Sequence, residues 1–304
     1  MRLVFILIAS ALMGLSVKAD DFKGTEFLLI YLGGQSNMDG FGYNRDLSED
    51  LLAPMKDVYI FDGNRIFSDR PAELGGLGMW APLQPGHGVG FGTDGKRNFL
   101  SNRFGAELVF AKKFAELTGK KLALVKYSAG GTALHEGAGY GNWWPFSKKP
   151  NQYNYAMKTF QTALQATDID GDGHIDRLVP TGILWMQGES DANVTVGIAK
   201  QYRSNLTRLM TLFRAAFHKT DLPVVIGKIT DSKMGENGAP LQPHIKYVHR
   251  GQKAFVKNDR CAAYMTETEG FEFSDDKWHY KTEGYLKMGQ YFAEHLHKLM
   301  QTCK

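Results

Sequence analysis

Long apolar runs are scarce in this 304-residue chain, and only its first 20 residues, MRLVFILIASALMGLSVKAD, contain one. There Arg2 precedes an apolar core from Leu3 to Val17, and Val17 and Ala19 form a small-x-small cleavage pattern. This arrangement is typical of a secretory signal peptide, and its core is short for a membrane span. We therefore expect cleavage near Ala19, a secreted or periplasmic product and no stable membrane insertion. An uncleaved anchor is the alternative.

Basic blocks, internal repeats and linker-like segments are also lacking. The formal net charge is only +4, and the Lys and Arg residues are scattered along the chain, so nucleic acid is not an expected partner. Because no linker divides the segment 20–304, we expect it to fold as a single domain. The segment is long enough to form a large hydrophobic core.

Cysteine is nearly absent, since the chain has only Cys261 and Cys303. In an exported protein two late cysteines predict a disulfide, which here would tie down the last helix. The alternative is a pair of free, buried thiols.

Apolar, β-branched runs alternate with segments of helical periodicity. One apolar stripe recurs every three or four residues from Ile198 to Phe217, which is typical of a buried helix face. Such alternation predicts an α/β fold whose mainly parallel sheet is covered on both faces. The predicted strands are 27–34, 57–63, 121–131, 178–189 and 222–230, and the predicted helices are 102–118, 154–167, 195–217, 243–257 and 282–300. The segment 63–101 is rich in Gly and Pro, and we expect a long ordered loop near a site.

Polar clusters follow three of these strands. Ser36 follows the first strand, SAGGT (128–132) follows the third, and MQGESDA (186–192) follows the fourth. Ligands of open parallel sheets bind beyond the carboxyl ends of the strands. We therefore expect the three clusters to share one site.

A serine becomes a nucleophile when a base accepts its proton. Of the nine histidines, only His279 has an aspartate three residues before it, Asp276. An acyl-transfer site also needs donors for an oxyanion; the candidates are the N–H groups of Ser36 and of Gly130 or Gly131, and the Gln187 amide. Taken alone, Ser36 could equally cap a helix, and His279 could be a surface histidine.

The segments GGQSNMDG, SAGGTAL, WMQGESDA and DDKWHY together resemble the SGNH hydrolase superfamily, in its sialate O-acetylesterase and acetylxylan esterase branch, carbohydrate esterase family six. The resemblance spans residues 33–279 and implies a three-layer α/β/α, flavodoxin-like fold. No G-x-S-x-G motif of ordinary α/β-hydrolases is present. The resemblance implies that Ser36 is the nucleophile, His279 the base and Gln187 an oxyanion donor. Asp276 matches the usual orienting acid, whereas Glu189 matches the acid of this branch, and both stay open.

The implied activity is removal of O-acetyl groups from carbohydrates (acetylated xylan, another glycan or O-acetyl sialic acid) through an acyl-enzyme, with no cofactor for catalysis. An SGNH esterase for a lipid or other small ester is the first alternative, and a non-catalytic glycan-binding protein is the second. Trp143 and Trp144 could stack on a sugar or simply pack in the core. His135 could line the pocket or be an ordinary loop residue, and Asn37 could contact substrate or cap the first helical turn.

The segment DIDGDGHID carries a separate signal. Asp168, Asp170, Asp172 and Asp176 occupy the spacing of the first, third, fifth and ninth positions of a calcium loop, but Val179 replaces the glutamate of the twelfth. Carboxylates packed this closely repel one another unless a cation neutralises them. We expect a structural calcium site, with an exposed acidic turn as the alternative.

Overall fold

The segment FLLIYLGG forms most of β1 (Glu26–Gly34), the central strand of a seven-stranded sheet in the computed structural model, which describes residues 22–64, 76–148 and 151–303. The strand order is β13-β12-β11-β1-β8-β3-β4. All pairs are parallel except β3 with the edge strand β4. The other strands are β3 (Val58–Asp62), β4 (Trp80–Pro82), β8 (Lys121–Ser128), β11 (Arg177–Met186), β12 (Val224–Gly227) and β13 (Ala262–Met265).

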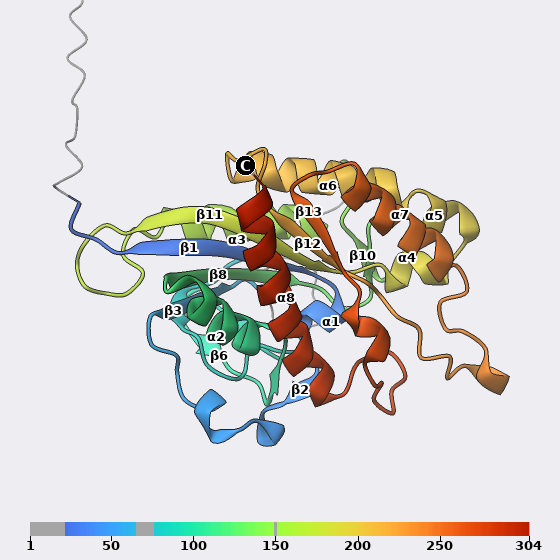
Figure 1. The fold of residues 1–304 in the computed structure, drawn as a ribbon, viewed down its shortest axis with the longest axis horizontal. Helices are drawn as coiled ribbons and strands as arrows, with labels where there is room; N and C mark the ends of the chain where they lie inside the picture. The colour runs from blue at the N-terminus through green and yellow to red at the C-terminus, as the bar shows by residue number, and fades with distance from the viewer. Residues whose placement is uncertain (1–21, 65–75, 149–150, 304) are drawn as a thin grey trace, which may run out of the picture.

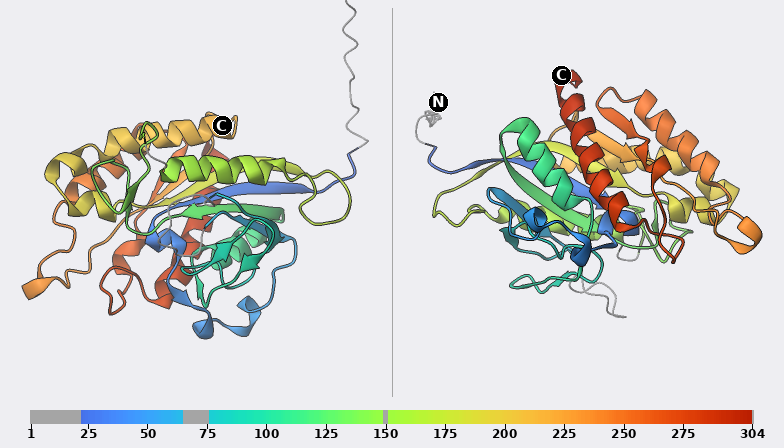
Figure 2. Two further views of the ribbon diagram at one scale, coloured as in Figure 1. Left: turned by 180° about the vertical axis from the view of Figure 1, so that it is seen from behind. Right: turned by 60° about the horizontal axis from the view of Figure 1, so that its bottom comes forward.

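Helices cover both faces of this sheet, which gives the three layers predicted from the sequence (Figures 1 and 2). One layer contains α2 (Glu107–Thr118) and α8 (Thr282–Thr302), which pack on each other. The other contains α3 (Gln152–Gln165), α6 (Tyr202–Ala216) and α7 (Ile245–Lys257). Because both faces are covered, β1 is buried from Phe27 to Gly34, as expected for a central parallel strand.

The predicted stripe of α6 is buried, and Tyr31 of β1 packs edge-on against Phe160 of α3 and Phe213 of α6. The helix predicted over 195–217 is divided at Gln201 into α5 (Val196–Lys200) and α6. The helix predicted over 102–118 begins only at Glu107, because residues 103–104 form β7 instead.

Short elements occupy the connections between these strands and helices. They comprise α1 (Ser36–Asp39), α4 (Glu189–Asn193), the pair β2 (Gly42–Tyr43) with β7 (Arg103–Phe104), the pair β5 (Gly92–Thr93) with β6 (Asn98–Phe99), the pair β9 (Thr132–Ala133) with β10 (Gly141–Asn142), and the 3-10 turns η2 (Asn44–Asp46), η3 (Glu49–Leu51), η4 (Glu236–Gly238) and η5 (Glu267–Gly270). The sequence pattern did not predict β4 and β13, since both are short.

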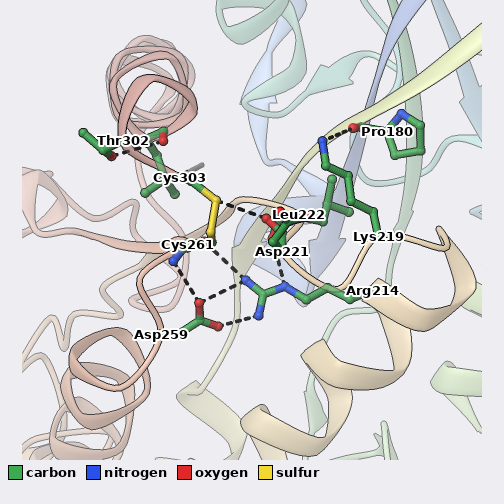
Figure 3. The surroundings of a disulfide bond; sticks show 10 residues. Pro180, Arg214, Lys219, Asp221, Leu222, Asp259, Cys261, Thr302 and Cys303 are labelled. Atoms are coloured by element: carbon green, nitrogen blue, oxygen red, sulfur yellow. Dashed lines mark hydrogen bonds and ion pairs between the residues drawn. A yellow bond between two sulfur atoms is a disulfide. The ribbon is translucent and has the colours of Figure 1, made fainter.

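A disulfide joins Cys261, just before β13, to Cys303, at the end of α8, with the two Cα atoms 4.9 Å apart (Figure 3). Beside it, Arg214 of α6 pairs with Asp259 and donates to the carbonyl of Leu222. Together these contacts fasten one outer layer and the last helix to the edge of the sheet.

The predicted signal peptide (residues 1–19) lies outside the described residues. Within 22–64, 76–148 and 151–303, no helix has the length and apolar character needed to cross a bilayer.

Candidate active site

Ser36 is the first residue of the single-turn helix α1, immediately beyond β1. The strand can turn here because Gly34 adopts φ +151°, and a Cβ at this position would lie only 2.0 Å from the carbonyl oxygen of Met186 on β11. Glycine therefore allows the ends of β1 and β11 to approach closely. The result is a nearly buried serine, 9% exposed, at the carboxyl edge of the sheet.

The glycine loop after β8 lies directly against Ser36. Ala129 extends the β1–β8 ladder by donating its N–H to Gly34 O at 3.1 Å. A Cβ placed on Gly130 would be 3.5 Å from the Ser36 Cβ, so the Gly130 backbone borders the serine side chain. Within the described part of the chain, the N–H groups of Ser36 and Gly130 donate to no protein acceptor, which leaves both free for an oxyanion.

His279 and Asp276 form a hydrogen-bonded pair in the loop that precedes α8. The Asp276 Oδ2 atom lies 2.7 Å from His279 Nδ1, while Oδ1 accepts the N–H groups of Trp278 (2.8 Å) and His279 (2.9 Å). The imidazole stacks on Phe41 with ring centroids 3.5 Å apart and planes only 7° from parallel. One hydrogen bond and one stacking contact thus fix the orientation of the ring, and two backbone hydrogen bonds fix the Asp276 carboxylate.

Burial and hydrogen bonding shift the pKa values of both members of this pair. Burial lowers the pKa of His279 below 6.5; the hydrogen bond and charge of Asp276 oppose this effect, while the positive charge of Arg103 adds to it. Burial also disfavours the Asp276 carboxylate, but the hydrogen bonds from His279 and Trp278 outweigh it and hold the Asp276 pKa below its usual value.

Asn37 joins α1 to the loop that contains His279. Its Nδ2 atom donates to the carbonyl of Trp278 at 3.3 Å, so the residue after Ser36 contacts the residue before His279. Its Oδ1 atom accepts the hydroxyl of Tyr285, on α8, at 2.9 Å. The structure therefore brings the serine and the histidine to the same edge from segments some 240 residues apart, as Figure 1 shows for α1 and the segment before α8.

Glu189, the first residue of α4, does not contact the imidazole. Its Oε1 atom accepts Asn37 Nδ2 at 2.9 Å, and in the amide orientation that satisfies both ends of Gln35, that side chain donates to Oε2 at 3.1 Å. Glu189 thus binds the residues on both sides of Ser36. Burial raises its pKa, and the hydrogen bond from Asn37 opposes that shift.

The structure corrects the role expected of Gln187 as an oxyanion donor. This side chain is fully buried, and its Nε2 atom donates to Thr132 O at 3.0 Å and to Asp191 Oδ2 at 2.8 Å. Both N–H bonds of the amide have acceptors inside the protein, so neither is free for an oxyanion. Gln187 instead holds the strand that follows the glycine loop.

Asp191 is a site residue that the sequence analysis missed. Its carboxylate accepts the N–H groups of Leu134 (2.8 Å) and His135 (3.1 Å) as well as the Gln187 amide. Burial raises its pKa to about 6. Its place in GESDA, four residues after Gln187, is the signal that could have identified it.

Among the residues expected to contact sugar, Trp143 is corrected to a core residue. It is 1% exposed, packs edge-on against Trp185 and donates its indole N–H to Thr132 Oγ1. Trp144 is half-buried with the Arg208 guanidinium over its ring, 4.5 Å from the centroid. His135 is half-buried and accepts the N–H of Gly137, so its ring closes its own loop.

A different aromatic residue, Tyr140, lies beside the glycine loop with its side chain fully exposed. Its N–H donates to Gly131 O at 2.8 Å, and its ring lies over Gly131, where a Cβ would be 2.6 Å from Cδ2. The sequence analysis singled out the neighbouring tryptophans instead. The isolated tyrosine between two glycines in GYG was the available signal.

In the acidic loop, Asp168, Asp170 and Asp176 converge, with one oxygen of each within 4.8 Å of the others. Asp172 is outside this group and accepts the N–H of His174. Gly171 and Gly173 adopt φ values of +77° and +84°, which let the loop fold around the carboxylates. A set of carboxylate oxygens is the chemistry that calcium prefers, so the three residues fit that ion, whereas Asp172 does not share their cluster.

Comparison with known proteins identifies a family and a shared fold. The model of the family "Carbohydrate esterase, sialic acid-specific acetylesterase" matches residues 26–298. No curated protein sequence matches the chain. Among solved structures, an Arabidopsis thaliana protein is similar at 20% identity and a TM-score of 0.62, over 92% of this chain and all of that one.

Two further structures share the fold. A carbohydrate acetylesterase from Xanthomonas citri is similar at 18% identity and a TM-score of 0.57, over 90% of this chain but only 56% of its own. The protein NanS is similar at 13% identity and a TM-score of 0.55, over 91% of this chain and 97% of that one. With most of its length matched by the family model and its fold shared with these structures, the chain belongs to the sialic acid-specific acetylesterase family of carbohydrate esterases and is a carboxylic ester hydrolase.

Proposed function

We propose that this protein is an exported serine esterase that removes O-acetyl groups from carbohydrates through an acyl-enzyme, acting as a single catalytic domain after loss of its signal peptide. The observation that carries the proposal is the convergence of the Asp276–His279 pair on α1 through the Asn37–Trp278 hydrogen bond, with Gly130 against Ser36. A nucleophile, an oriented base and free N–H donors are the three requirements of acyl transfer.

In the proposed first half-reaction, His279 Nε2 accepts the proton of Ser36 Oγ while that oxygen attacks the acetyl carbonyl carbon. The electron pair of the carbonyl moves to its oxygen, which accepts hydrogen bonds from the N–H groups of Ser36 and Gly130. The tetrahedral intermediate then expels the sugar oxygen, which takes the proton from Nε2. Asp276 keeps the other proton on Nδ1, so that Nε2 is the basic atom throughout.

In the second half-reaction a water molecule loses a proton to His279 Nε2 and attacks the acetyl-serine. The same two N–H groups stabilise the new oxyanion, and its collapse returns the proton from His279 to Ser36 Oγ and releases acetic acid, which ionises to acetate in water. Glu189 acts here as a positioning residue, because its bonds to Asn37 and Gln35 hold both neighbours of the nucleophile.

The acidic loop has a separate, structural role in this proposal. Calcium would be held by Asp168, Asp170 and Asp176. Asp170 and Asp176 also bind the hydroxyl and the N–H of Thr25, respectively, just before β1. The ion would therefore fasten the start of the central strand and supply no chemistry to the ester.

Acetate release from a panel of acetylated xylan, other acetylated glycans and O-acetyl sialic acid tests the proposed activity, with wild type compared with Ser36→Ala. We expect release by wild type from at least one member and a loss of at least 10³-fold in the variant. Wild-type protein that releases no acetate from any member refutes the carbohydrate substrate. A Ser36→Ala variant with full activity refutes the mechanism.

A further inference from the structure

Tyr140 combines complete exposure with proximity to the reaction centre. Gly130 borders the Ser36 side chain, Gly131 follows it, and the Tyr140 ring lies over Gly131. An aromatic ring is an amphipathic surface that normally gains stability by burial. A single exposed ring is common on protein surfaces, so the location on the glycine loop that borders Ser36, and not the exposure alone, singles out Tyr140.

The backbone that carries this ring is rigidly held. Tyr140 donates its N–H to Gly131, and the flanking Gly139 forms a bridge with Thr132. Thr132 belongs to β9, and this strand is held in turn by two side chains. Gln187 donates to Thr132 O, and Asp191 accepts the N–H of Leu134, just after β9. An exposed ring on a fixed loop loses little conformational freedom when a ligand covers it.

Gly131 is the residue that admits the ring to this position. With φ +66° it adopts a conformation that favours glycine, and any side chain there would overlap the tyrosine ring. The ring edge therefore lies on the glycine loop, within reach of a substrate whose ester carbonyl is bound by the N–H groups of Ser36 and Gly130.

We propose that Tyr140 is the platform on which the sugar ring of the substrate stacks, and that it selects acetyl esters of carbohydrates over small acyclic esters. The apolar C–H face of a pyranose suits an exposed aromatic face, whereas the alcohol of a small ester would not extend that far. This inference rests on the proposed function, because it specifies how the same site recognises the alcohol portion of the ester.

Steady-state acetate release by wild type, Tyr140→Ala and Tyr140→Phe tests the platform, with the acetylated saccharide that wild type cleaves and with ethyl acetate. Phe146→Ala is the matched control, because Phe146 is also an exposed aromatic residue (68%) but packs on Trp144. We expect Tyr140→Ala to lower kcat/KM for the saccharide about tenfold, chiefly through KM, and to leave ethyl acetate within about twofold. Tyr140→Phe should retain saccharide activity.

Equal losses on both esters would overturn the inference, since they would indicate a damaged glycine loop. An unchanged kcat/KM for the saccharide in Tyr140→Ala would also overturn it. A wild-type protein that cleaves ethyl acetate and no saccharide would instead refute the proposed substrate class, which distinguishes the two failures.

A buried charged cluster behind α1 supports a second, independent inference. The fully buried Lys126 of β8 donates to the carbonyl of Asp39, the last residue of α1, at 2.8 Å, and pairs with Glu107 at 2.9 Å. Asn64, at the end of the β3 segment, donates to Asp39 Oδ1 at 2.9 Å and to Ser128 Oγ at 3.0 Å, and its Oδ1 atom accepts the Ser128 N–H at 2.8 Å.

These bonds connect the two elements whose relative position decides the oxyanion geometry. Asp39 ends the helix that begins with Ser36, and Ser128 is two residues before Gly130. Asn64 touches both, although it belongs to neither. We infer that Asn64 is a positioning residue, which sets the distance between the nucleophile and the glycine N–H donors.

Asn64→Ala and Asn64→Asp test this role, with Asn205→Ala as the control for loss of a buried asparagine, because Asn205 lies on α6 away from α1. We expect both Asn64 variants to lower kcat about tenfold with KM within about twofold, and Asn205→Ala to lower only the melting temperature. The aspartate variant keeps the acceptor for Ser128 and decides the question where the alanine variant fails to fold. Wild-type kcat in a folded Asn64→Asp protein would overturn the inference.

Discussion

Replacing Asp276 by asparagine distinguishes the two acids that could orient His279. Asp276 Oδ1 accepts two backbone N–H groups at 2.8 and 2.9 Å, and Oδ2 accepts His279 Nδ1 at 2.7 Å. An asparagine has one oxygen, which must remain with the two N–H donors because an NH₂ group there would face them. The NH₂ group therefore faces Nδ1 and forces the ring proton onto Nε2.

A ring protonated at Nε2 cannot accept the Ser36 proton, so the general base is lost through the wrong tautomer. A change of this kind costs about 10³- to 10⁴-fold in kcat. In Asp276→Ala either tautomer remains accessible, so we expect this variant to be about tenfold more active than Asp276→Asn. If only the charge of Asp276 mattered, both variants would have the same kcat. A lower kcat for Asp276→Asn than for Asp276→Ala therefore indicates the effect of the tautomer.

Glu189→Gln should behave differently, because its oxygen can still accept Asn37 Nδ2 while its NH₂ group faces the Gln35 amide, which can turn its own oxygen toward that group. The substitution replaces a charged hydrogen-bond acceptor with a neutral one. We expect this to weaken the hydrogen bond by about 1 kcal/mol, which corresponds to about a fivefold loss in kcat. The assay is acetate release at saturating substrate, with melting curves to show that each variant is folded, and the exposed neighbour Asp275→Asn as the control. Near-wild-type activity in Asp276→Asn, with a 10³-fold loss in Glu189→Gln, would reverse the assignment of the acids.

Three further predictions concern pH, calcium and the disulfide. The imidazole must be neutral to accept a proton, and burial lowers the His279 pKa. We therefore expect kcat/KM to rise with pH through a midpoint below 6.5. A midpoint above 6.5 in a pH–rate profile would contradict the argument from burial. Millimolar CaCl₂ should raise the melting temperature of chelator-treated protein by about 5 °C and leave kcat unchanged. Asp168→Asn should abolish this shift. An identical melting temperature with and without the ion would argue against the site. The Cys261–Cys303 disulfide spans 42 residues, and its removal should lower the free energy of unfolding by about 4 kcal/mol. The melting temperature of the Cys261→Ala/Cys303→Ala variant should therefore fall by about 8 °C or more. A shift under 2 °C would mean that α8 is held in place without the disulfide.

The periodicity of apolar residues was sufficient to predict the five strands that form the core of the sheet and the two helical layers. These elements are long and buried, so hydrophobic patterning dominates their sequences. The short edge strands β4 and β13 escaped prediction because three or four residues carry too little pattern, and pairing with a neighbour decides their conformation.

The site shows the same division. Ser36 and Gly130 could be predicted to lie together, because the topology brings strand ends to one edge. Their catalytic roles, and that of His279, stay predictions. Gln187 and Trp143 were assigned to the substrate side, yet both are buried with their N–H groups bonded inside the protein. A sequence shows which hydrogen-bond donors and acceptors a side chain has, but not which partners they bind in the folded protein.

The sequence by itself determined the order of strands and helices, the position of Ser36 after β1 and the pairing of an aspartate with a histidine three residues later, because these depend on local spacing and hydrophobic period. Only the tertiary structure decided that Asp276 and not Glu189 holds the imidazole, that Gln187 binds Thr132 at the end of the glycine loop, and that Tyr140 rather than Trp143 faces solvent beside Gly131. Each of these outcomes depends on contacts between segments distant in the chain, and packing across the sheet edge selects among partners that are chemically equivalent in the sequence.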